Sequence, residues 1–358
     1  LANNSTPLIS PFEKLVTQLG LDYTDCDATK KYASCPTMAY HEGVKHFGEK
    51  AAREATRLEL TQMLNKDVFT AKHISELTAE ERKEIIPSML NLKDKYSASD
   101  VFEKLKGRLC AGGHRQNREK YTPEETAAPT AALTSILMVA ALAAHKNLDV
   151  CTVDVPGAYL NSTLEKTVYM RLRKELAAMY VSIQPDTAKY LLKDGTMVVQ
   201  LKRALYGCIE SARLWYEHIS KVLTSHGYTS CPHDPCVFRK IQNGEVVVTV
   251  VIYVDDLLVA SVDVSHREEL VKTLRKEYGN LTERYGYKHD YLGMAFDFSE
   301  NQCVKVSMPK TTNEILRDHP VEGTSDTPAG NDLYTVGLSE PASESEQKEL
   351  YSVAYKLL

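Results

Sequence analysis

Two adjacent carboxylates, Asp255 and Asp256, stand in the middle of the most apolar stretch of this 358-residue chain. The flanking residues, from Val246 to Ser261, are mostly Val, Ile and Leu, a pattern that predicts buried β-strands on both sides of the pair. The stretch is too short and too rich in β-branched residues for a membrane helix. Two neighbouring carboxylates in low dielectric cost several kcal/mol and repel each other, so a positive charge is expected beside them.

A third carboxylate, Asp154, ends a predicted strand over Leu148–Val155. Strand alternation alone sends Asp255 and Asp256 to opposite faces, so a tight turn is needed to aim both at one point. If the Asp154 strand pairs beside them, the three acids can hold two divalent cations about 3.5–4 Å apart. Oxygen donors without His or Cys favour Mg²⁺. The alternative is that these acids merely mark a hairpin turn and a strand end, where Asp is common.

Composition is that of an ordinary globular protein, with 25% charged and 43% hydrophobic residues, and the length predicts two or three subdomains. The net charge of -5 argues against a uniformly basic nucleic-acid binder. A local basic groove stays open, because one segment gathers Lys104, Lys106, Arg108, His114, Arg115, Arg118 and Lys120.

The eight cysteines are scattered and form no CxxC motif, which favours reduced thiols in an intracellular protein. Cys231 and Cys236 could belong to a zinc site, but no second Cys/His pair lies nearby in the sequence. A turn leading into a strand over Val237–Lys240 is therefore favoured. No signal peptide or transmembrane segment is visible. The chain starts without Met and stops inside an amphipathic pattern, which predicts a piece of a longer protein.

Helices alternate irregularly with antiparallel strand pairs, so the sequence predicts an α+β fold. In the helix predicted over Pro129–His145, the residues Leu133, Ile136, Leu137, Ala140 and Leu142 are expected to face inward. Thr78 and Glu81 form a capping-box pattern for a short helix. Further helices are expected over 47–64, 211–226 and 265–278 and from 311, with a hairpin turning at 97–100, a strand pair over 291–298 and 303–308, and a loop over 318–345.

The apolar hairpin motif Tyr253-Val-Asp-Asp256 resembles the YxDD hairpin of reverse transcriptases. The segment Thr152–Asn161 resembles their first catalytic motif, with an aromatic residue five positions after the Asp. More narrowly, the chain is similar to the polymerase region of copia-type LTR retrotransposon polyproteins. The further motifs that carry this resemblance, in family order, are Leu105–Gln116, Leu201–Gly207 with Arg213–Tyr216, Asp234–Phe238 and Tyr291–Met294.

The resemblance implies a right-hand polymerase with an antiparallel palm sheet, fingers and a partial thumb. Residues 1–45 would be a linker or irregular extension, and 46–298 the fingers (mainly 46–130) and palm (mainly 131–298). Residues 299–358 would be the start of a thumb or connection, truncated at the end of the chain. The implied reaction is template-directed DNA synthesis on RNA or DNA, from a primer and deoxynucleoside triphosphates, during retrotransposon replication.

The resemblance also implies roles for single residues. Asp154, Asp255 and Asp256 would be catalytic and would bind two Mg²⁺ ions, or Mn²⁺ in their place, with the Val155 carbonyl as an extra ligand. Nucleotide binding would fall to Lys106, Arg108, Tyr159 (as a steric gate against ribose) and Gly207. The hairpin Tyr291-Leu292-Gly293 would grip the primer, with Lys288 as a proton donor to pyrophosphate. A core position for Tyr159 and a solvated one for Lys106 are the alternatives.

Two departures from the family pattern are visible. Pro156 replaces a common Lys, and the segment Cys208–Ala212 replaces Leu-Lys-Gln-Ala-Pro, which brings in Glu210. The alternative function is therefore a catalytically decayed remnant that folds and binds nucleic acid without polymerising; a different two-metal phosphotransferase or nuclease is a third. An active polymerase would work inside the cell, in a cytoplasmic particle and in the nucleus, without a membrane partner and in an oligomeric state that the sequence does not indicate.

Overall fold

The computed structural model describes residues 38–96, 102–320, 323 and 342–357. The chain divides into two compact units, Met38–Arg317 and a smaller one formed by Leu1–Thr37 with Asp318–Leu358. In the described part of the smaller unit lies one helix, α11 (Glu344–Leu357), which is amphipathic. Among the described residues, no helix has the length and apolarity needed to cross a membrane.

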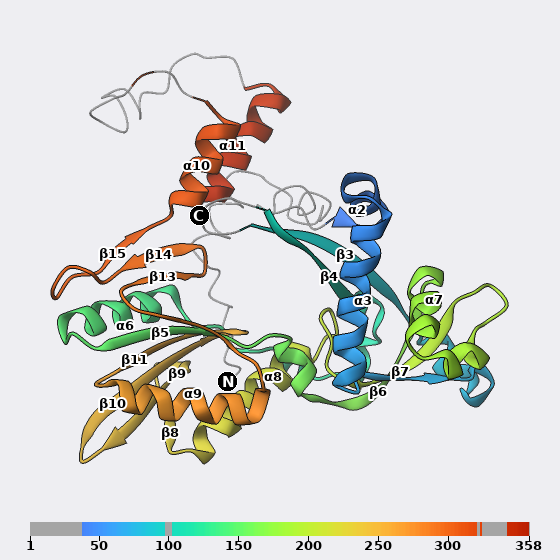
Figure 1. Cartoon of the computed structure of the whole chain (residues 1–358), viewed down its shortest axis with the longest axis horizontal. Helices are drawn as coiled ribbons and strands as arrows, with labels where there is room; N and C mark the ends of the chain where they lie inside the picture. Colours follow the sequence, from blue (N-terminus) through green and yellow to red (C-terminus); the bar gives the residue numbers. More distant parts are fainter. Residues whose placement is uncertain (1–37, 97–101, 321–322, 324–341, 358) are drawn as a thin grey trace, which may run out of the picture. The chain divides into compact units, whose positions relative to one another are not determined.

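The first sheet of the larger unit has six strands in the order β1-β3-β6-β7-β2, with β4 added beside β3 (Figure 1). Only the β3–β6 pairing in this sheet is parallel. Helices α3 (Glu49–Asn65) and α7 (Lys174–Ile183) share a buried cluster with it through residues such as Leu60 and Leu176. The strands are β1 (Met38–Ala39), β2 (Phe69–Lys72), β3 (Ile86–Tyr96), β4 (Phe102–Ala111), β6 (Thr163–Leu172) and β7 (Met197–Arg203).

The second sheet is antiparallel throughout, in the order β12-β5-β11-β10-β9-β8. It contains both candidate acidic motifs. Its strands are β5 (Asp149–Asp154), β8 (Tyr228–Cys231), β9 (Asp234–Gln242), β10 (Glu245–Tyr253), β11 (Asp256–Ser261) and β12 (Thr282–Tyr285).

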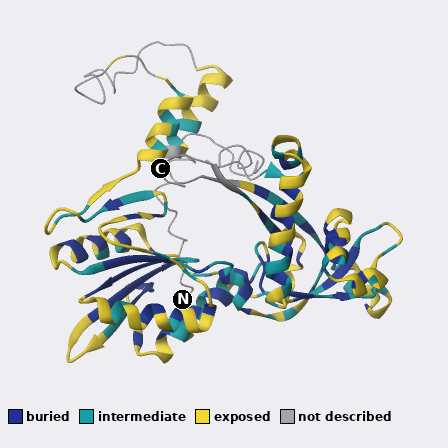
Figure 2. Ribbon diagram, viewed as in Figure 1, coloured by how far each residue is buried: buried dark blue, intermediate teal, exposed yellow. Residues whose placement is uncertain are grey.

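Both faces of the second sheet are covered, which explains why its strands are continuously apolar. Val250 and Leu257 pack in a cluster with α8 (Ser211–Ser225) and α9 (Val264–Tyr278). Val251 and Leu258, one position along each strand, pack in another cluster with α6 (Leu133–His145). Figure 2 shows these central strands as buried. The prediction of buried strands on both sides of Asp255 and Asp256 is confirmed.

A third sheet of three short antiparallel strands, β13 (Lys288–Tyr291), β14 (Met294–Asp297) and β15 (Lys305–Ser307), precedes helix α10 (Pro309–Asp318). Phe296 joins it to the cluster beneath α6. The strand expected over 291–298 is wrong at its start, because Leu292 and Gly293 form a turn there. The pairing of β14 with β15 around the turn at 299–302 is confirmed.

Helix α6 corrects a prediction about which side chains face inward. Ile136 and Ala140 are buried as expected, but Leu133, Leu137 and Leu142 are 55%, 38% and 45% exposed. The helix is apolar on all sides, so periodicity could not identify its inner face. The inner face of α6 consists of Ile136 and the small side chains of Ala140 and Ala143, which share a buried cluster with the sheet.

The helices predicted over 47–64, 211–226 and 265–278 and from 311 agree with α3, α8, α9 and α10 within two residues, whereas α7 was not predicted. The Thr78–Glu81 capping box is present, with both reciprocal hydrogen bonds, at the start of α4 (Ala79–Lys83). The irregular extension predicted for 1–45 falls mostly outside the described residues, but α2 (Tyr40–Phe47) is helical where irregular chain was expected. Tyr40 and Val44, four positions apart, pack against the buried cluster of Ala52, Ala55 and Leu92, which explains the helix. The predicted turn at 97–100 and most of the predicted loop at 318–345 lie outside the described residues.

Candidate active site

The pairing of three strands brings the candidate carboxylates to one edge of the second sheet. Asp154, the last residue of β5, lies directly opposite Asp256, the first residue of β11. Residues opposite each other on neighbouring strands project from the same face, with Cβ atoms about 5 Å apart. Asp256 is also opposite Tyr253 on β10, so Val254 and Asp255 form a two-residue hairpin turn. The Val155 backbone N–H donates to the Asp255 carbonyl at 3.0 Å and ties this turn to β5.

The turn that carries Asp255 has an unusual backbone. Val254 has a φ of 55°, in the left-handed region. A β-branched residue rarely adopts this conformation, and such strain costs about 1–3 kcal/mol. The Trp215 indole Nε1–H donates to the Val254 carbonyl at 2.5 Å. The turn places Asp255 next to the start of β11, where Asp256 lies opposite Asp154; the convergence of both carboxylates on one point stays a prediction.

The carboxylates influence each other electrostatically. Burial, together with the negative charges of Asp255 and Asp154, raises the pKa of Asp256 to about 6, while Arg284 opposes this shift. Repulsion of this kind is what a bound cation relieves. The three acids offer the hard oxygen donors that Mg²⁺ prefers, so the residues fit such an ion. As the side chains lie, however, no three His, Cys, Asp or Glu in the described parts of the chain enclose a metal site.

Tyr206 connects several of the candidate residues, and the sequence argument gave it no role. Its hydroxyl donates to Asp255 Oδ2 at 3.4 Å. Its ring lies edge-to-face with Tyr159 at 4.6 Å between centroids, and the Arg108 guanidinium lies 4.5 Å from the ring centre. Burial and the charges of Asp255 and Asp154 raise the pKa of Tyr206. The sequence signal for Tyr206 was its place within the motif Leu201–Gly207.

Two of the predicted nucleotide-binding residues, Arg108 and Tyr159, are therefore brought to the carboxylate edge. Tyr159, on a short 3₁₀ turn over Ala158–Asn161, is half-buried, and burial together with Asp255 raises its pKa. Lys106 is exposed on β4, two residues before Arg108 and opposite Lys93 on β3. Two lysines facing each other across a strand pair are unfavourable unless an anion lies between them.

Gly207 has a packing reason to be glycine. Its φ is +91°, and a Cβ there would lie 2.2 Å from the Ala111 carbonyl oxygen. A Cβ on Gly113 would in turn lie 1.8 Å from the Gly207 oxygen. The end of β4 thus packs backbone to backbone on the loop before α8, where the Ala111 N–H donates to the Tyr206 carbonyl at 2.7 Å. The predicted contact of Gly207 with a nascent base pair stays a prediction.

The predicted primer-gripping residues form a hairpin. Tyr291 pairs with Met294, and the turn residues Leu292 and Gly293 have φ values of 53° and 78°. Positive φ at both central residues is the type I′ geometry of tight hairpins. Tyr291 is buried, and its hydroxyl donates to the Asp256 backbone carbonyl at 3.4 Å, so the hairpin adjoins the carboxylate edge. The exposed Lys288 forms an ion pair with Asp297 at 3.3 Å.

Glu210, one of the departures from the family pattern, is directed into the fold. Its side chain is only 1% exposed, and it accepts hydrogen bonds from Tyr121 and Gln116, both at 3.2 Å. The Gln116 amide oxygen also accepts the Ile209 N–H at 2.8 Å. Glu210 therefore ties the chain after β4 to the start of α8, which is a structural role.

The predicted turn between Cys231 and Cys236 joins β8 to β9, and both cysteines are free. Asp234 accepts backbone N–H groups of Cys236 and Ala132, so it fixes β9 to the start of α6. Among the described residues no cluster of His, Cys, Asp or Glu is arranged for a metal, so the zinc reading gains no support.

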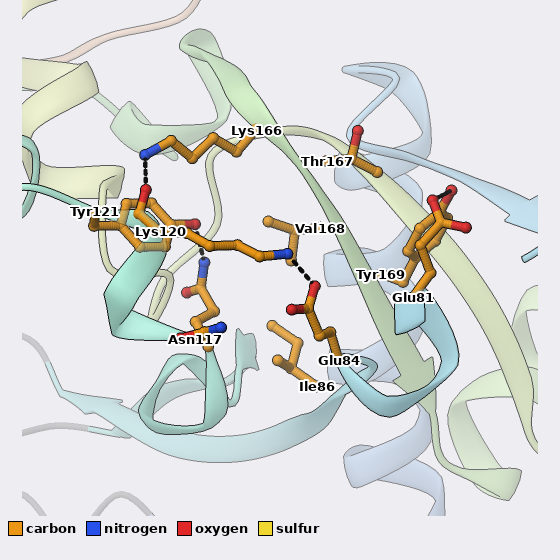
Figure 3. A pocket seen from close by; sticks show the side chains of 11 residues that line it. Glu81, Glu84, Ile86, Asn117, Lys120, Tyr121, Lys166, Thr167, Val168 and Tyr169 are labelled. Atoms are coloured by element: carbon orange, nitrogen blue, oxygen red, sulfur yellow. Dashed lines mark hydrogen bonds and ion pairs between the residues drawn. The ribbon is translucent and has the colours of Figure 1, made fainter. Parts of the chain in front are cut away.

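A cavity of about 410 Å³ lies on the first sheet, lined in part by Glu84, Lys120 and Lys166 (Figure 3). Its charged groups already have partners: Lys120 pairs with Glu84, and the Lys166 amine lies 4.1 Å from the centre of the Tyr121 ring and pairs with Glu125. None of the candidate site residues lines it. This cavity is therefore separate from the carboxylate edge.

Comparison with known proteins agrees with these motifs. A family model described as reverse transcriptase (RNA-dependent DNA polymerase) matches residues 77–328. The Transposon Ty1-ER2 Gag-Pol polyprotein of Saccharomyces cerevisiae is 23% identical over 334 residues, which cover 90% of this chain and 17% of that polyprotein. The Retrovirus-related Pol polyprotein from transposon RE1 of Arabidopsis thaliana is 29% identical over 205 residues, or 56% of this chain and 12% of the relative.

Among solved structures, the foamy viral protease-reverse transcriptase in complex with double-stranded DNA matches 82% of this chain and 38% of that chain, with 12% identity and a TM-score of 0.40. The chain spans 12% to 17% of the length of the two transposon polyproteins. The family model covers well over half of the chain. The chain therefore belongs to the reverse transcriptase (RNA-dependent DNA polymerase) family, in the form carried by copia-type retrotransposon polyproteins.

Proposed function

We propose that this chain catalyses template-directed DNA synthesis: it adds deoxynucleotides to the 3′ end of a primer on an RNA or DNA template and releases pyrophosphate. The observation that carries the proposal is the register of β5 and β11, which puts Asp154 opposite Asp256 with Asp255 in the adjoining turn. The transposon relatives support retrotransposon replication as the context. Our proposal is that this replication takes place in cytoplasmic particles and in the nucleus.

Asp154 and Asp255 would hold two Mg²⁺ ions, or Mn²⁺ in their place, with Asp256 and the Val155 carbonyl as further ligands. Such ions, when bound, lower the pKa of the attacking primer hydroxyl and neutralise charge on the phosphates. The protein's own part is to keep the carboxylates on one edge. The strand pairing does this for Asp154 and Asp256, and the Tyr206 hydroxyl orients Asp255.

Arg108 and Lys106 would bind the triphosphate of the incoming nucleotide, since a guanidinium can contact phosphate oxygens in a bidentate way. Tyr159 would exclude nucleotides with a ribose 2′-hydroxyl by steric conflict. Its edge-to-face contact with Tyr206 fixes the ring, which supports a gate of defined position. Gly207 would lie under the nascent base pair.

In this proposal the first sheet with α3 belongs to the fingers, within residues 46–130 and the adjoining β6 and β7. The second sheet with α6, α8 and α9 is the palm, and residues 299–358 begin the thumb. The β13–β14 hairpin, with Tyr291, Leu292 and Gly293 at its tip, would hold the primer terminus. Its support is the hydrogen bond from Tyr291 to the Asp256 backbone.

The test is primer extension on RNA and DNA templates, with Mg²⁺ and with a chelator. Asp154→Asn should lower extension by at least about 10³-fold, because a ligand to both ions loses its charge. The matched control is Asp149→Asn, at the other end of β5. Asp149 pairs with Arg267 at 2.8 Å, so its loss should lower stability and leave extension intact in the folded protein.

The other outcomes assign other functions. Salt-sensitive binding of primer–template without extension would show the decayed, nucleic-acid-binding remnant. Degradation of nucleic acid without added nucleotides would show a nuclease. Equal loss of extension in the two Asp→Asn variants would contradict a specific role for Asp154.

A further inference from the structure

Trp215 is the only tryptophan of the chain and lies on α8, beneath the turn that carries Asp255. It is 1% exposed. Its ring packs edge-to-face on Tyr278 of α9, at 5.2 Å between centroids, within the cluster under the second sheet. Its one polar atom, Nε1, donates to the Val254 carbonyl at 2.5 Å.

The partner of this hydrogen bond is the strained residue of the turn. Val254 occupies the left-handed region, at φ 55°, where a β-branched side chain is disfavoured. Left to itself, the turn would relax toward a backbone that Val prefers, and the Asp255 carboxylate would turn with it. Strain of this kind persists only where neighbouring groups hold it.

We propose that Trp215 is a positioning residue for catalysis: its indole N–H holds the Val254 carbonyl and thereby keeps Asp255 aimed at the edge it shares with Asp154 and Asp256. This rests on the proposed polymerase function. Trp215 acts through the turn backbone and does not touch substrate.

Packing alone does not explain the hydrogen bond. The Tyr278 hydroxyl, in the same cluster, is buried and has no hydrogen-bond partner among the described residues. Burial in this cluster therefore does not by itself provide a polar group with a hydrogen-bond partner. The Trp215 N–H has one because α8 places it within reach of the Val254 carbonyl. Tyr278→Phe consequently serves as a matched control, since it changes the same cluster without touching the turn.

The experiment replaces the indole N–H by sulfur, using a benzothiophene analogue of tryptophan that keeps the shape of the ring. Because the chain has one tryptophan, incorporation in place of tryptophan changes this position alone. We expect kcat for primer extension to fall about tenfold, with KM for the nucleotide within about twofold of its original value. Tyr278→Phe should leave both constants unchanged.

Adding Val254→Gly tests the mechanism of the loss. Glycine adopts positive φ freely, so the turn no longer needs to be held. In a double-mutant cycle, the analogue should lower kcat by at most about threefold when Val254→Gly is already present. An unchanged kcat with the analogue alone, or an equal loss with and without Val254→Gly, would overturn the proposal.

A readout without catalysis separates this proposal from the proposed function. The single indole N–H should give one ¹H–¹⁵N resonance that exchanges slowly with solvent and shifts in the Val254→Gly variant. If the unmodified chain extends no primer, the polymerase function fails while a slow, shifted resonance still supports the hydrogen bond to the turn. A fast-exchanging resonance contradicts the hydrogen bond whatever the activity.

Discussion

A two-residue hairpin turn lies at each end of strand β10, and the two turns differ in how well their residues suit the turn backbone. At its start, Asn243 and Gly244 have φ values of 51° and 83°, the type I′ geometry that Asn-Gly favours. At its end, the turn consists of Val254 and Asp255, with Val254 in the left-handed region at φ 55°. One turn has the residues its geometry prefers, and the other has a residue that its geometry disfavours.

The difference separates a turn that only reverses the chain from one that must also aim a carboxylate. The Asn243-Gly244 turn needs no outside support. The Val254-Asp255 turn has support from three directions, through the Trp215 indole, the Tyr206 hydroxyl and the Val155 backbone N–H. Backbone strain and the contacts that hold it occur at only one end of β10. This difference favours a functional role for the Val254-Asp255 turn.

The largest effect should come from replacing the residues of the Val254-Asp255 turn by the Asn-Gly pair of the other turn. Val254→Asn combined with Asp255→Gly should abolish extension, by at least about 10³-fold, because a metal ligand is lost. The same variant should be more stable by about 1 kcal/mol, since the left-handed strain is relieved. Primer extension and urea unfolding measure the two effects, and a variant that stays active would show that Asp255 is dispensable.

A smaller loss is expected for Tyr206→Phe, which keeps the ring and removes the hydroxyl that bonds Asp255. We expect extension to fall about three- to tenfold, which matches the usual net worth of one hydrogen bond, about 0.5–1.5 kcal/mol; the 3.4 Å length of this bond argues against the larger values of charged pairs. Discrimination against ribonucleotides should stay intact, because the ring still supports Tyr159. Single-nucleotide incorporation with deoxy- and ribonucleotides measures both. A loss of discrimination equal to the loss of rate would count against this division of roles.

The reverse transplant, Asn243→Val with Gly244→Asp, should affect stability alone. It puts a β-branched residue in the left-handed conformation without a supporting tryptophan, which should cost about 1–3 kcal/mol. Extension should be unchanged at temperatures where the variant is folded. Denaturant unfolding followed by extension assays tests this, and a large drop in activity of the folded variant would remove the contrast between the two turns.

The smallest effect concerns pH. The pKa of Asp256 is raised to about 6 from an ordinary value of 3.8, first by burial and then by Asp255 and Asp154. Above about pH 6 the ionised Asp256 lowers the free energy of unfolding, because its charge is less favourable in the folded than in the unfolded chain. This loss of stability disappears as the pH falls toward the ordinary pKa of 3.8. Without divalent ions, Asp256→Asn should therefore stabilise the protein by about 1 kcal/mol at pH 8, allowing for solvent screening, and not at pH 4. A gain that persists at pH 4 would point to another cause.

Much of the fold could be predicted because the apolar pattern determines it locally. The helices at 211–225 and 264–278 and the strands around Asp255 agree with the sequence almost to the residue. Helix α6 could not be oriented, since an apolar helix has no polar face to mark its outer side. Nearly all of α2 was missed because this helix depends on tertiary packing against a buried cluster that includes Leu92.

At the site, the meeting of Asp154 with Asp256 could be predicted from two strand ends and a turn. The supports of the turn could not be predicted. Tyr206 and Trp215 lie in motifs that carry the family resemblance, but both are distant in sequence from Asp255, and no local pattern indicates that they contact the turn. The packing role of Gly207 was likewise hidden, because its close neighbour Ala111 lies 96 positions earlier in the chain. Contacts between separate elements depend on how those elements pack, which local patterns do not specify.

The most direct measurement is anomalous scattering from crystals of the protein with primer–template, a non-hydrolysable nucleotide and Mn²⁺. We expect manganese peaks within about 2.2 Å of carboxylate oxygens of both Asp154 and Asp255, beside the nucleotide phosphates. Bound nucleotide with manganese elsewhere, or with Asp154 and Asp255 turned away from it, would contradict the account.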